Sequence, residues 1–252
     1  MKLSGGKLKV KDLKVFLQES YNDPAPIDIM GYKLDEAISK KSILMSQMTA
    51  RAYVNAELKH VVVTHRGTGM EKMGSDWVNN AVYASSPAGI AAYKLTPRYL
   101  RAKAVQDAVH KKYKASDGWT VDTTGHSQGG LLSHLLGTQS KNSIGFNPAS
   151  KSESLGKNQY IVRSSFDAVS ALSGPAQAMN ESLYPGWSKN HYITIPAETS
   201  NPVTEHGVPI LDRLDPEMVI GKGVNKLRKL KGYIINTEML GGCACHKMKG
   251  VK

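Results

Sequence analysis

The sequence predicts an α/β protein in which helices cover both faces of a mostly parallel central sheet. Short β-branched runs alternate along the chain with helical patterns, an alternation typical of parallel sheets. Residues 60–65 (HVVVTH) predict a buried strand with a sharp exit, because a β-branched run leads there toward a glycine. The other strand-like runs are 51–54, 119–124, 143–146, 160–163 and 192–195.

Two helices are predicted from the spacing of apolar residues. Residues 11–20 have three apolar side chains on one helical side, and the Asn-Asp-Pro sequence at 22–24 ends this segment. Thr96 followed by Pro97 is a favourable helix start, which predicts a helix over residues 97–114. Its apolar residues at helical spacing are Leu100, Ala104, Val105, Ala108 and Val109.

The positive charge is concentrated at the two ends of the chain. The 252 residues have a formal net charge of +12, to which residues 1–14 contribute +4 and residues 222–252 contribute +7. Only +1 is left for residues 15–221, so the charge favours solvated basic ends over a nucleic-acid-binding body. We therefore expect one domain over residues 1–221, with a basic N-terminal segment, and a flexible basic tail over residues 222–252.

Targeting and metal-binding signals are weak in this sequence. The first residues contain no apolar core of a signal peptide, and no stretch approaches the ~18 apolar residues of a membrane span. We therefore expect an intracellular protein, soluble or peripherally bound to a membrane. Cys243 and Cys245 with His246 offer three ligands where a structural zinc site takes four, so we expect ordinary thiols, no metal and no cofactor.

The strongest chemical signal is the sequence GHSQGG at residues 125–130. This Gly-x-Ser-x-Gly pattern follows a predicted strand and precedes a predicted helix, the context in which such a serine is a nucleophile. Gly125 and Gly129 remove side-chain bulk, so that strand and helix can pack closely while the hydroxyl of Ser127 projects from the turn. The sequence therefore predicts Ser127 as a nucleophile.

A serine nucleophile needs a base and an orienting acid, which follow it in the order acid then histidine in α/β-hydrolases. Asp167 is the predicted acid, because it comes just after the strand at 160–163. His206 is the favoured base, in the loop beyond the last predicted strand. His191 remains the alternative, although it opens that strand and is expected at its wrong end.

The predicted oxyanion hole combines two chain segments. The backbone N–H of Gln128, the residue after the serine, is one expected donor. Thr68 supplies the second, from the loop that follows the strand at 60–65. Gly67 lets the backbone of that loop turn close to a substrate.

These residues together resemble the class 3 lipase family, the fungal-lipase-like branch of the α/β-hydrolase fold. The similar motifs are Arg-Gly-Thr at 66–68, Asp-Trp at 76–77, GHSQGG at 125–130 and GFNP at 145–148, and the resemblance spans roughly residues 50–210. It implies an α/β-hydrolase fold and places a lid over residues 69–77. By position it also implies Ser127 as nucleophile, Asp167 as acid, His206 as base, and Thr68 with Gln128 as oxyanion donors.

The sequence thus predicts a serine hydrolase of carboxylic esters, with lipid acyl esters as the favoured substrates. The alternative is a weak or inactive hydrolase-fold binding protein that docks on anionic membranes or nucleic acid through its basic ends. The basic cluster at 226–231 favours such docking, and it could also hold an active lipase at anionic lipid. Aromatic residues for base stacking are missing within this cluster, which argues against single-stranded nucleic acid.

Overall fold

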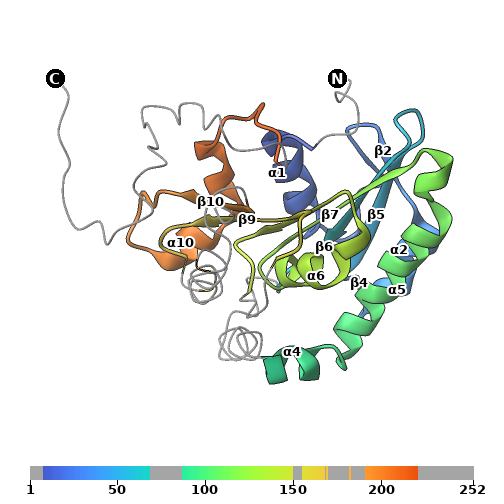
Figure 1. Ribbon diagram of the computed structural model, residues 1–252, viewed down its shortest axis with the longest axis horizontal. Helices are drawn as coiled ribbons and strands as arrows, with labels where there is room; N and C mark the ends of the chain where they lie inside the picture. Colours follow the sequence, from blue (N-terminus) through green and yellow to red (C-terminus); the bar gives the residue numbers. More distant parts are fainter. Residues whose placement is uncertain are drawn as a thin grey trace.

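A computed structural model describes residues 8–68, 87–149, 155–167, 169, 182 and 191–220. Its centre is an eight-stranded sheet with the order β1-β2-β5-β6-β7-β8-β9-β10 (Figure 1). The four pairings from β6 to β10 are parallel, and the three from β1 to β6 are antiparallel. The predicted α/β class with a mostly parallel sheet is therefore confirmed.

The elements alternate along the chain much as the sequence predicts. The sheet strands are β1 (Asp28–Ile29), β2 (Tyr32–Leu34), β5 (Ala50–Asn55), β6 (His60–His65), β7 (Thr120–His126), β8 (Asn142–Phe146), β9 (Gln159–Ser164) and β10 (Tyr192–Ile195), and a separate hairpin pairs β3 (Ile43–Leu44) with β4 (Gln47–Met48). The α-helices are α1 (Val10–Glu19), α2 (Glu36–Ser39), α4 (Pro87–Tyr93), α5 (Pro97–Lys112), α6 (Gln128–Leu136) and α10 (Pro202–His206). Short 3₁₀ turns are η1 (Lys40–Ser42), η3 (Ala115–Asp117), η4 (Gly137–Gln139) and η5 (Val208–Arg213).

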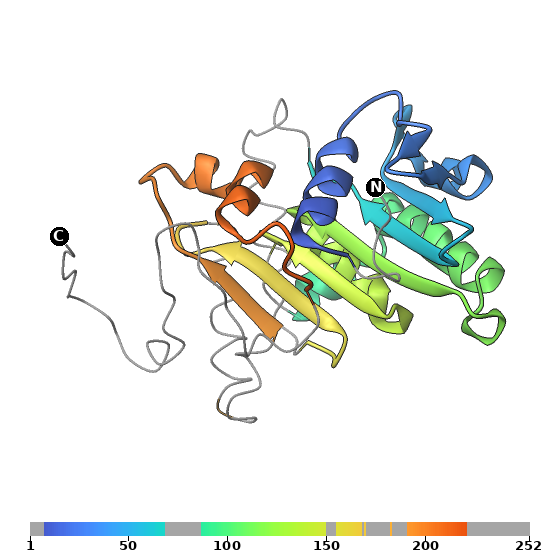
Figure 2. The same cartoon turned by 90° about the horizontal axis from the view of Figure 1, so that it is seen from above.

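Each face of the sheet has its own apolar core. Val62 of β6 packs in the core beneath α1 and η5, whereas Val61 and Val63 pack in the core beneath α5 and α6 (Figure 2). Successive side chains of a strand point to opposite faces, so an unbroken β-branched run serves both cores. Helices therefore cover the sheet on both faces, as expected.

Helix α5 begins where the sequence predicts, and its buried face includes a polar residue. The hydroxyl oxygen of Thr96 accepts a hydrogen bond from the Tyr99 N–H at 3.3 Å. Leu100 is 53% exposed and Ala104 is also exposed, while the polar Gln106 is buried. The Gln106 amide nitrogen donates to the hydroxyls of Thr123 and Ser140 in the interior. The spacing of apolar residues does not reveal that Gln106 is buried, because a polar side chain can also be buried when it has hydrogen-bond partners.

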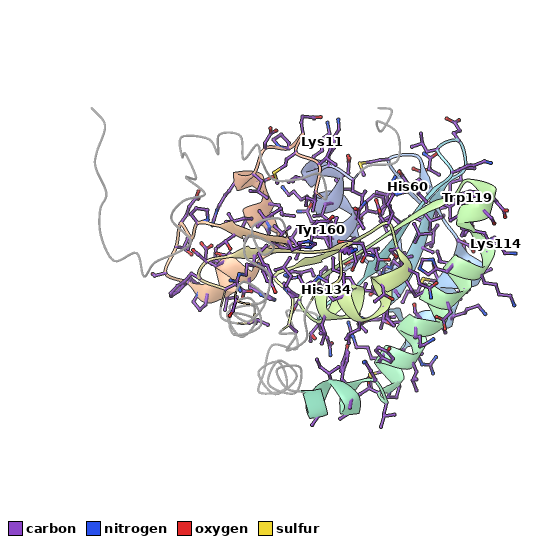
Figure 3. All side chains as sticks on the ribbon, in the orientation of Figure 1. Lys11, His60, Lys114, Trp119, His134 and Tyr160 are labelled. Carbon is purple, nitrogen blue, oxygen red and sulfur yellow. The ribbon has the colours of Figure 1, made fainter. Side chains whose placement is uncertain are left out.

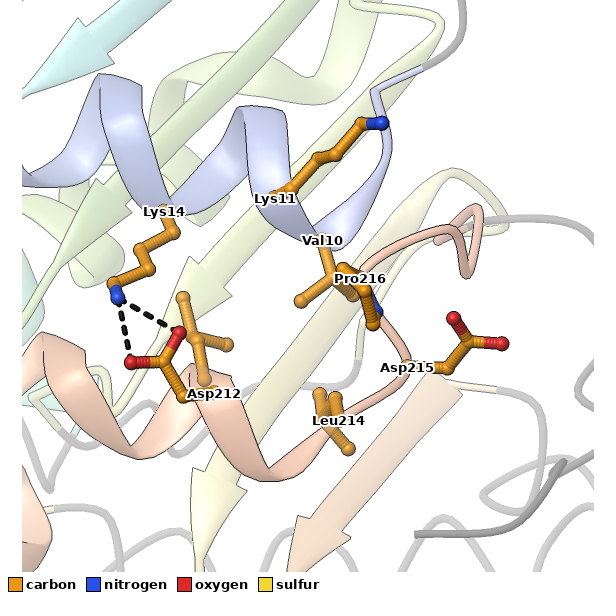
Figure 4. A pocket seen from close by; sticks show the side chains of 8 residues that line it. Val10, Lys11, Lys14, Asp212, Leu214, Asp215 and Pro216 are labelled. Carbon is orange, nitrogen blue, oxygen red and sulfur yellow. Dashed lines mark hydrogen bonds and ion pairs between the residues drawn. The ribbon is translucent and has the colours of Figure 1, made fainter. Parts of the chain in front are cut away.

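The N-terminal basic residues from Lys9 onward belong to the fold. Lys9 lies 2.6 Å from Glu217, Lys11 pairs with the same carboxylate, and Lys14 lies 2.6 Å from Asp212. Lys11 and the Lys14–Asp212 pair line an open hollow of about 680 Å³ between α1 and the segment formed by η5 and the residues after it (Figure 4). The expectation of a solvated N-terminal end is therefore wrong for residues 9–14.

Two sequence-based expectations concern residues that the structure does not describe. The basic tail at 222–252 and the lid segment at 69–77 lie outside the described residues. Within the described part, no helix combines the length and apolar character needed to cross a membrane.

Candidate active site

Ser127 occupies a sharp turn between β7 and α6. Its φ of 57° and ψ of −124° lie in a region that residues other than glycine rarely adopt. The turn is held by backbone bonds, because the Ser127 N–H donates to the Phe146 carbonyl and the Ser127 carbonyl accepts from Ala149, each at 3.0 Å. Its side chain caps none of the described amides of α6. Ser127 thus lies on a strained strand-to-helix turn, where the Gly-x-Ser-x-Gly pattern predicts it.

The glycines around Ser127 let three backbone segments meet. A Cβ added to Gly125 would overlap the Gly129 carbonyl, and one added to Gly129 would overlap the His65 carbonyl. Strands β6 and β7 and helix α6 thus touch backbone to backbone at the elbow. Helix α6 is also tied to the sheet by His134, whose Nε2–H donates to the Tyr160 carbonyl at 3.1 Å (Figure 3).

Asp167 and His206 form a buried hydrogen-bonded pair. Nδ1 of His206 donates to Oδ1 of Asp167 at 2.8 Å, and the two residues are 5% and 1% exposed. Asp167 follows β9 and His206 ends α10, so both lie beyond the carboxyl ends of neighbouring parallel strands. With the proton on Nδ1, the neutral imidazole leaves Nε2 as its basic nitrogen.

The alternative base, His191, lies at the other end of the sheet. Its Nδ1 donates to the carbonyl of Gln159, which begins β9, at 2.7 Å. Because β9 and β10 are parallel, this end is opposite to the end that Asp167 follows. The structure thus brings His206 and not His191 to Asp167.

His126 links the elbow to the base. Its Nε2–H donates to the His206 carbonyl at 2.8 Å, and the two ring centroids are 4.7 Å apart. The hydroxyl of Tyr21 donates to Nδ1 of His126 at 2.7 Å. Burial, reinforced by the neighbouring His206, lowers the pKa of His126 to about 3, so this ring stays neutral near pH 7. His126, the residue directly before Ser127, thus holds the backbone of His206.

Thr68 and Gln128 lie next to each other, as oxyanion donors from two segments must. The Thr68 hydroxyl donates to Oε1 of Gln128 at 3.2 Å. Gln128 begins α6, so its backbone N–H has no carbonyl one turn earlier in the helix. A Cβ on Gly67 would come 2.7 Å from the His126 carbonyl, which shows how closely this loop passes the elbow.

Two positions that the sequence analysis left out support the base. Glu205 is fully buried and lies 2.7 Å from the guanidinium of Arg213 and 2.5 Å from the Ser164 hydroxyl. Burial alone raises the pKa of Glu205, but the hydrogen bonds from Arg213, Ser164 and backbone amides lower it to about 2. Asn147 donates to the carbonyls of Glu205 and His206. The only sequence signals were the adjacency of Glu205 to His206 and an asparagine directly after a predicted strand.

The described residues contain no group of three His, Cys, Asp or Glu side chains that could hold a metal ion. Cys243, Cys245 and His246 lie outside this part of the chain, as do Asp76 and Trp77 of the lipase-like motif.

Comparisons with known proteins give only a distant likeness to solved structures. No family model matches the chain, and neither does any curated protein. Among solved structures, the native Rhizomucor miehei lipase propeptide complex aligns with a TM-score of 0.41 and 14% identity, over 84% of this chain and 80% of that one. The resemblance to class 3 lipases therefore rests on the sequence motifs.

Proposed function

We propose that this protein is a serine hydrolase of carboxylic esters with an α/β-hydrolase fold of the class 3 lipase type. The observation that carries the proposal is the buried Asp167–His206 pair, together with a serine on a positive-φ turn. His126, the neighbour of that serine, hydrogen-bonds the backbone of His206 and so connects the two parts. Nucleophile, acid and base then follow one another along the chain in the order typical of this fold.

Acylation begins when Nε2 of His206 removes the proton from the Ser127 hydroxyl as its oxygen attacks the ester carbonyl. The backbone N–H of Gln128 and the N–H and hydroxyl of Thr68 stabilise the oxyanion, for which the Thr68 hydroxyl turns away from the Gln128 side chain. Asp167 stabilises the positively charged imidazole and keeps its ring oriented. His206 then gives the proton to the leaving alkoxide, which departs as an alcohol and leaves an acyl-serine.

Deacylation repeats these steps with water. His206 takes a proton from the water molecule as its oxygen attacks the acyl carbonyl, and the collapse of the second intermediate returns that proton to the oxygen of Ser127. The acid product leaves, and the chain is back in its starting state. Ser127 is at the N-terminus of α6, where the helix dipole also favours developing negative charge.

Lipid acyl esters are the proposed substrates because exposed apolar side chains lie close in sequence to Asp167 and to His206. Phe166, next to Asp167, is 49% exposed, and Val203, on the helix that ends at His206, is 42% exposed. Exposed apolar side chains at a binding site favour contact with acyl chains over contact with charged groups.

The test is hydrolysis of p-nitrophenyl esters of increasing acyl length, together with labelling by a fluorophosphonate probe. The wild type should turn over esters and label, and Ser127→Ala should lose both. Ser133→Ala removes another buried hydroxyl on the same helix and should keep both activities. Labelling or turnover that persists in Ser127→Ala would refute the assignment. Salt-sensitive binding to anionic vesicles, without ester turnover, would instead favour the binding-protein alternative.

A further inference from the structure

Asn147 stands directly after β8, in a backbone conformation that few residues tolerate. Its φ is 39° and its side chain is fully buried. Asparagine is one of the few residues other than glycine that adopt a left-handed conformation readily. A glycine would meet the backbone requirement at least as well, so the side chain has a further use here.

The amide of Asn147 bonds three backbone groups from two other segments. Its Nδ2 donates to the carbonyls of Glu205 and His206 at 2.9 and 2.8 Å. Its Oδ1 accepts from the backbone N–H of Ser164 at 2.9 Å. Both amide hydrogens and the carbonyl oxygen thus have partners, all of them buried.

These partners belong to the segments that carry the acid and the base. Ser164 ends β9, and the chain reaches Asp167 three residues later. Glu205 and His206 end α10. The single amide therefore ties the end of β8 to both segments, and its bonds constrain the backbone from which the His206 ring projects.

We propose that Asn147 is a positioning residue that sets the orientation of His206 relative to Asp167 and Ser127. The inference rests on the proposed function for its kinetic consequence, but the hydrogen-bond geometry can be measured separately. A shift of about 1 Å in a reacting group can reduce turnover about 100-fold.

The chemistry of the site selects asparagine. Aspartate has the same shape but would turn a carboxylate oxygen toward two carbonyl oxygens, and it has no hydrogen to donate when ionised. The His206 carbonyl also accepts from His126 at 2.8 Å, so two donors from different strands hold this one group. Loss of Asn147 leaves one of these donors in place.

The experiment compares Asn147→Gly with Asn158→Gly. Asn158 is the matched control, because its amide also bonds three carbonyls, those of Gly137, Thr138 and Ser140, but at the start of β9. Ester kinetics would be measured for both variants. In parallel, proton NMR would follow the Nδ1–H of His206, which is deshielded by its bond to Asp167 and reports its geometry without turnover.

Asn147→Gly should lower kcat 10- to 100-fold with KM within about twofold, and should shift or broaden the His206 Nδ1–H signal. Asn158→Gly should keep kcat within threefold and leave that signal unchanged. Equal kinetics and an unchanged NMR signal in Asn147→Gly would overturn the proposal. If the wild type hydrolyses no ester, the proposed function fails while the NMR comparison still decides this point. If Asn147→Gly does not fold, Asn147→Ser retains one donor and is measured instead.

Discussion

Oδ1 of Asp167 accepts a hydrogen bond from Nδ1 of His206 at 2.8 Å, although 39 residues separate the two in the chain. The pair is almost fully buried, and it forms because β9 and α10 both end on the side of the sheet where β7 ends in the Ser127 turn. This hydrogen bond fixes the orientation of the His206 ring through its Nδ1 atom.

The first prediction concerns this pair. In Asp167→Asn, the new amide can donate to Nδ1 and so favours the imidazole tautomer with its proton on Nε2, which cannot accept the serine proton. We expect kcat to fall by about 10⁴-fold, measured by ester hydrolysis. Asp122→Asn is the control, because Asp122 forms another buried pair with His60 at 3.1 Å, and it should change kcat less than threefold. Retention of a tenth of the activity by Asp167→Asn would contradict the assigned role.

The second prediction concerns backbone strain at Ser127. A residue other than glycine in this conformation is strained by about 1–3 kcal/mol, and a glycine removes that strain. The glycine itself costs about 0.5–1 kcal/mol, because it loses more backbone entropy on folding. We expect Ser127→Gly to be about 1 kcal/mol more stable than Ser127→Ala in urea unfolding. Inside α6 the order should reverse, with Ser133→Gly about 1 kcal/mol less stable than Ser133→Ala. The same order at both positions would show that the Ser127 turn is unstrained.

The third prediction concerns the buried ion pair behind the base. Glu205→Gln leaves Arg213 without its main partner and should lower the free energy of unfolding at pH 7 by about 3–5 kcal/mol. Glu198, 3.3 Å from the same guanidinium but 59% exposed, is the control, and Glu198→Gln should cost less than about 1 kcal/mol. Equal losses in the two variants would argue against a special role of the buried carboxylate.

The same pair predicts a pH dependence. The pKa of Glu205 falls from an ordinary 4.5 to about 2 in the folded chain, so the unfolded chain binds the proton first as the solution is acidified. The stabilisation of the folded chain by the Glu205 carboxylate is therefore complete above about pH 4.5 and is lost as the pH falls toward 2. Urea unfolding curves should show the difference between wild type and Glu205→Gln shrinking across this range, and a constant difference would contradict the prediction.

The fourth prediction concerns the contact behind His126. Burial raises the pKa of Tyr21, so its hydroxyl stays protonated and donates to Nδ1 of His126. Tyr21→Phe leaves that buried nitrogen without the hydroxyl and should cost about 1–3 kcal/mol in urea unfolding. Tyr113→Phe should cost less. The Tyr113 hydroxyl donates to the carboxylate of Asp35, and in the variant this carboxylate still has Lys112 as a partner at 2.7 Å. A smaller loss in Tyr21→Phe than in Tyr113→Phe would contradict this account.

Much of the framework could be predicted from local patterns. The β-branched run at 60–65, the cap-and-proline start at Thr96 and the Gly-x-Ser-x-Gly turn at Ser127 each depend on neighbours within a few residues. The burial of Gln106 in α5 could not be predicted in this way, because its hydrogen-bond partners come from β7 and the turn before β8. A hydrogen-bond partner that is distant in the chain cannot be recognised from the pattern of residues around the side chain that it stabilises.

The sequence by itself determined the α/β class, the position of the turn at Ser127, and the acid and histidine positions from which a site could be chosen. Only the tertiary structure decided that His206, and not His191, contacts Asp167, because the parallel pairing of β9 and β10 sends these histidines to opposite ends of the sheet. It also decided that Asn147 and His126 hold the backbone of His206. Local propensity acts over a few residues, whereas these contacts join strands and loops that only the folded sheet brings together.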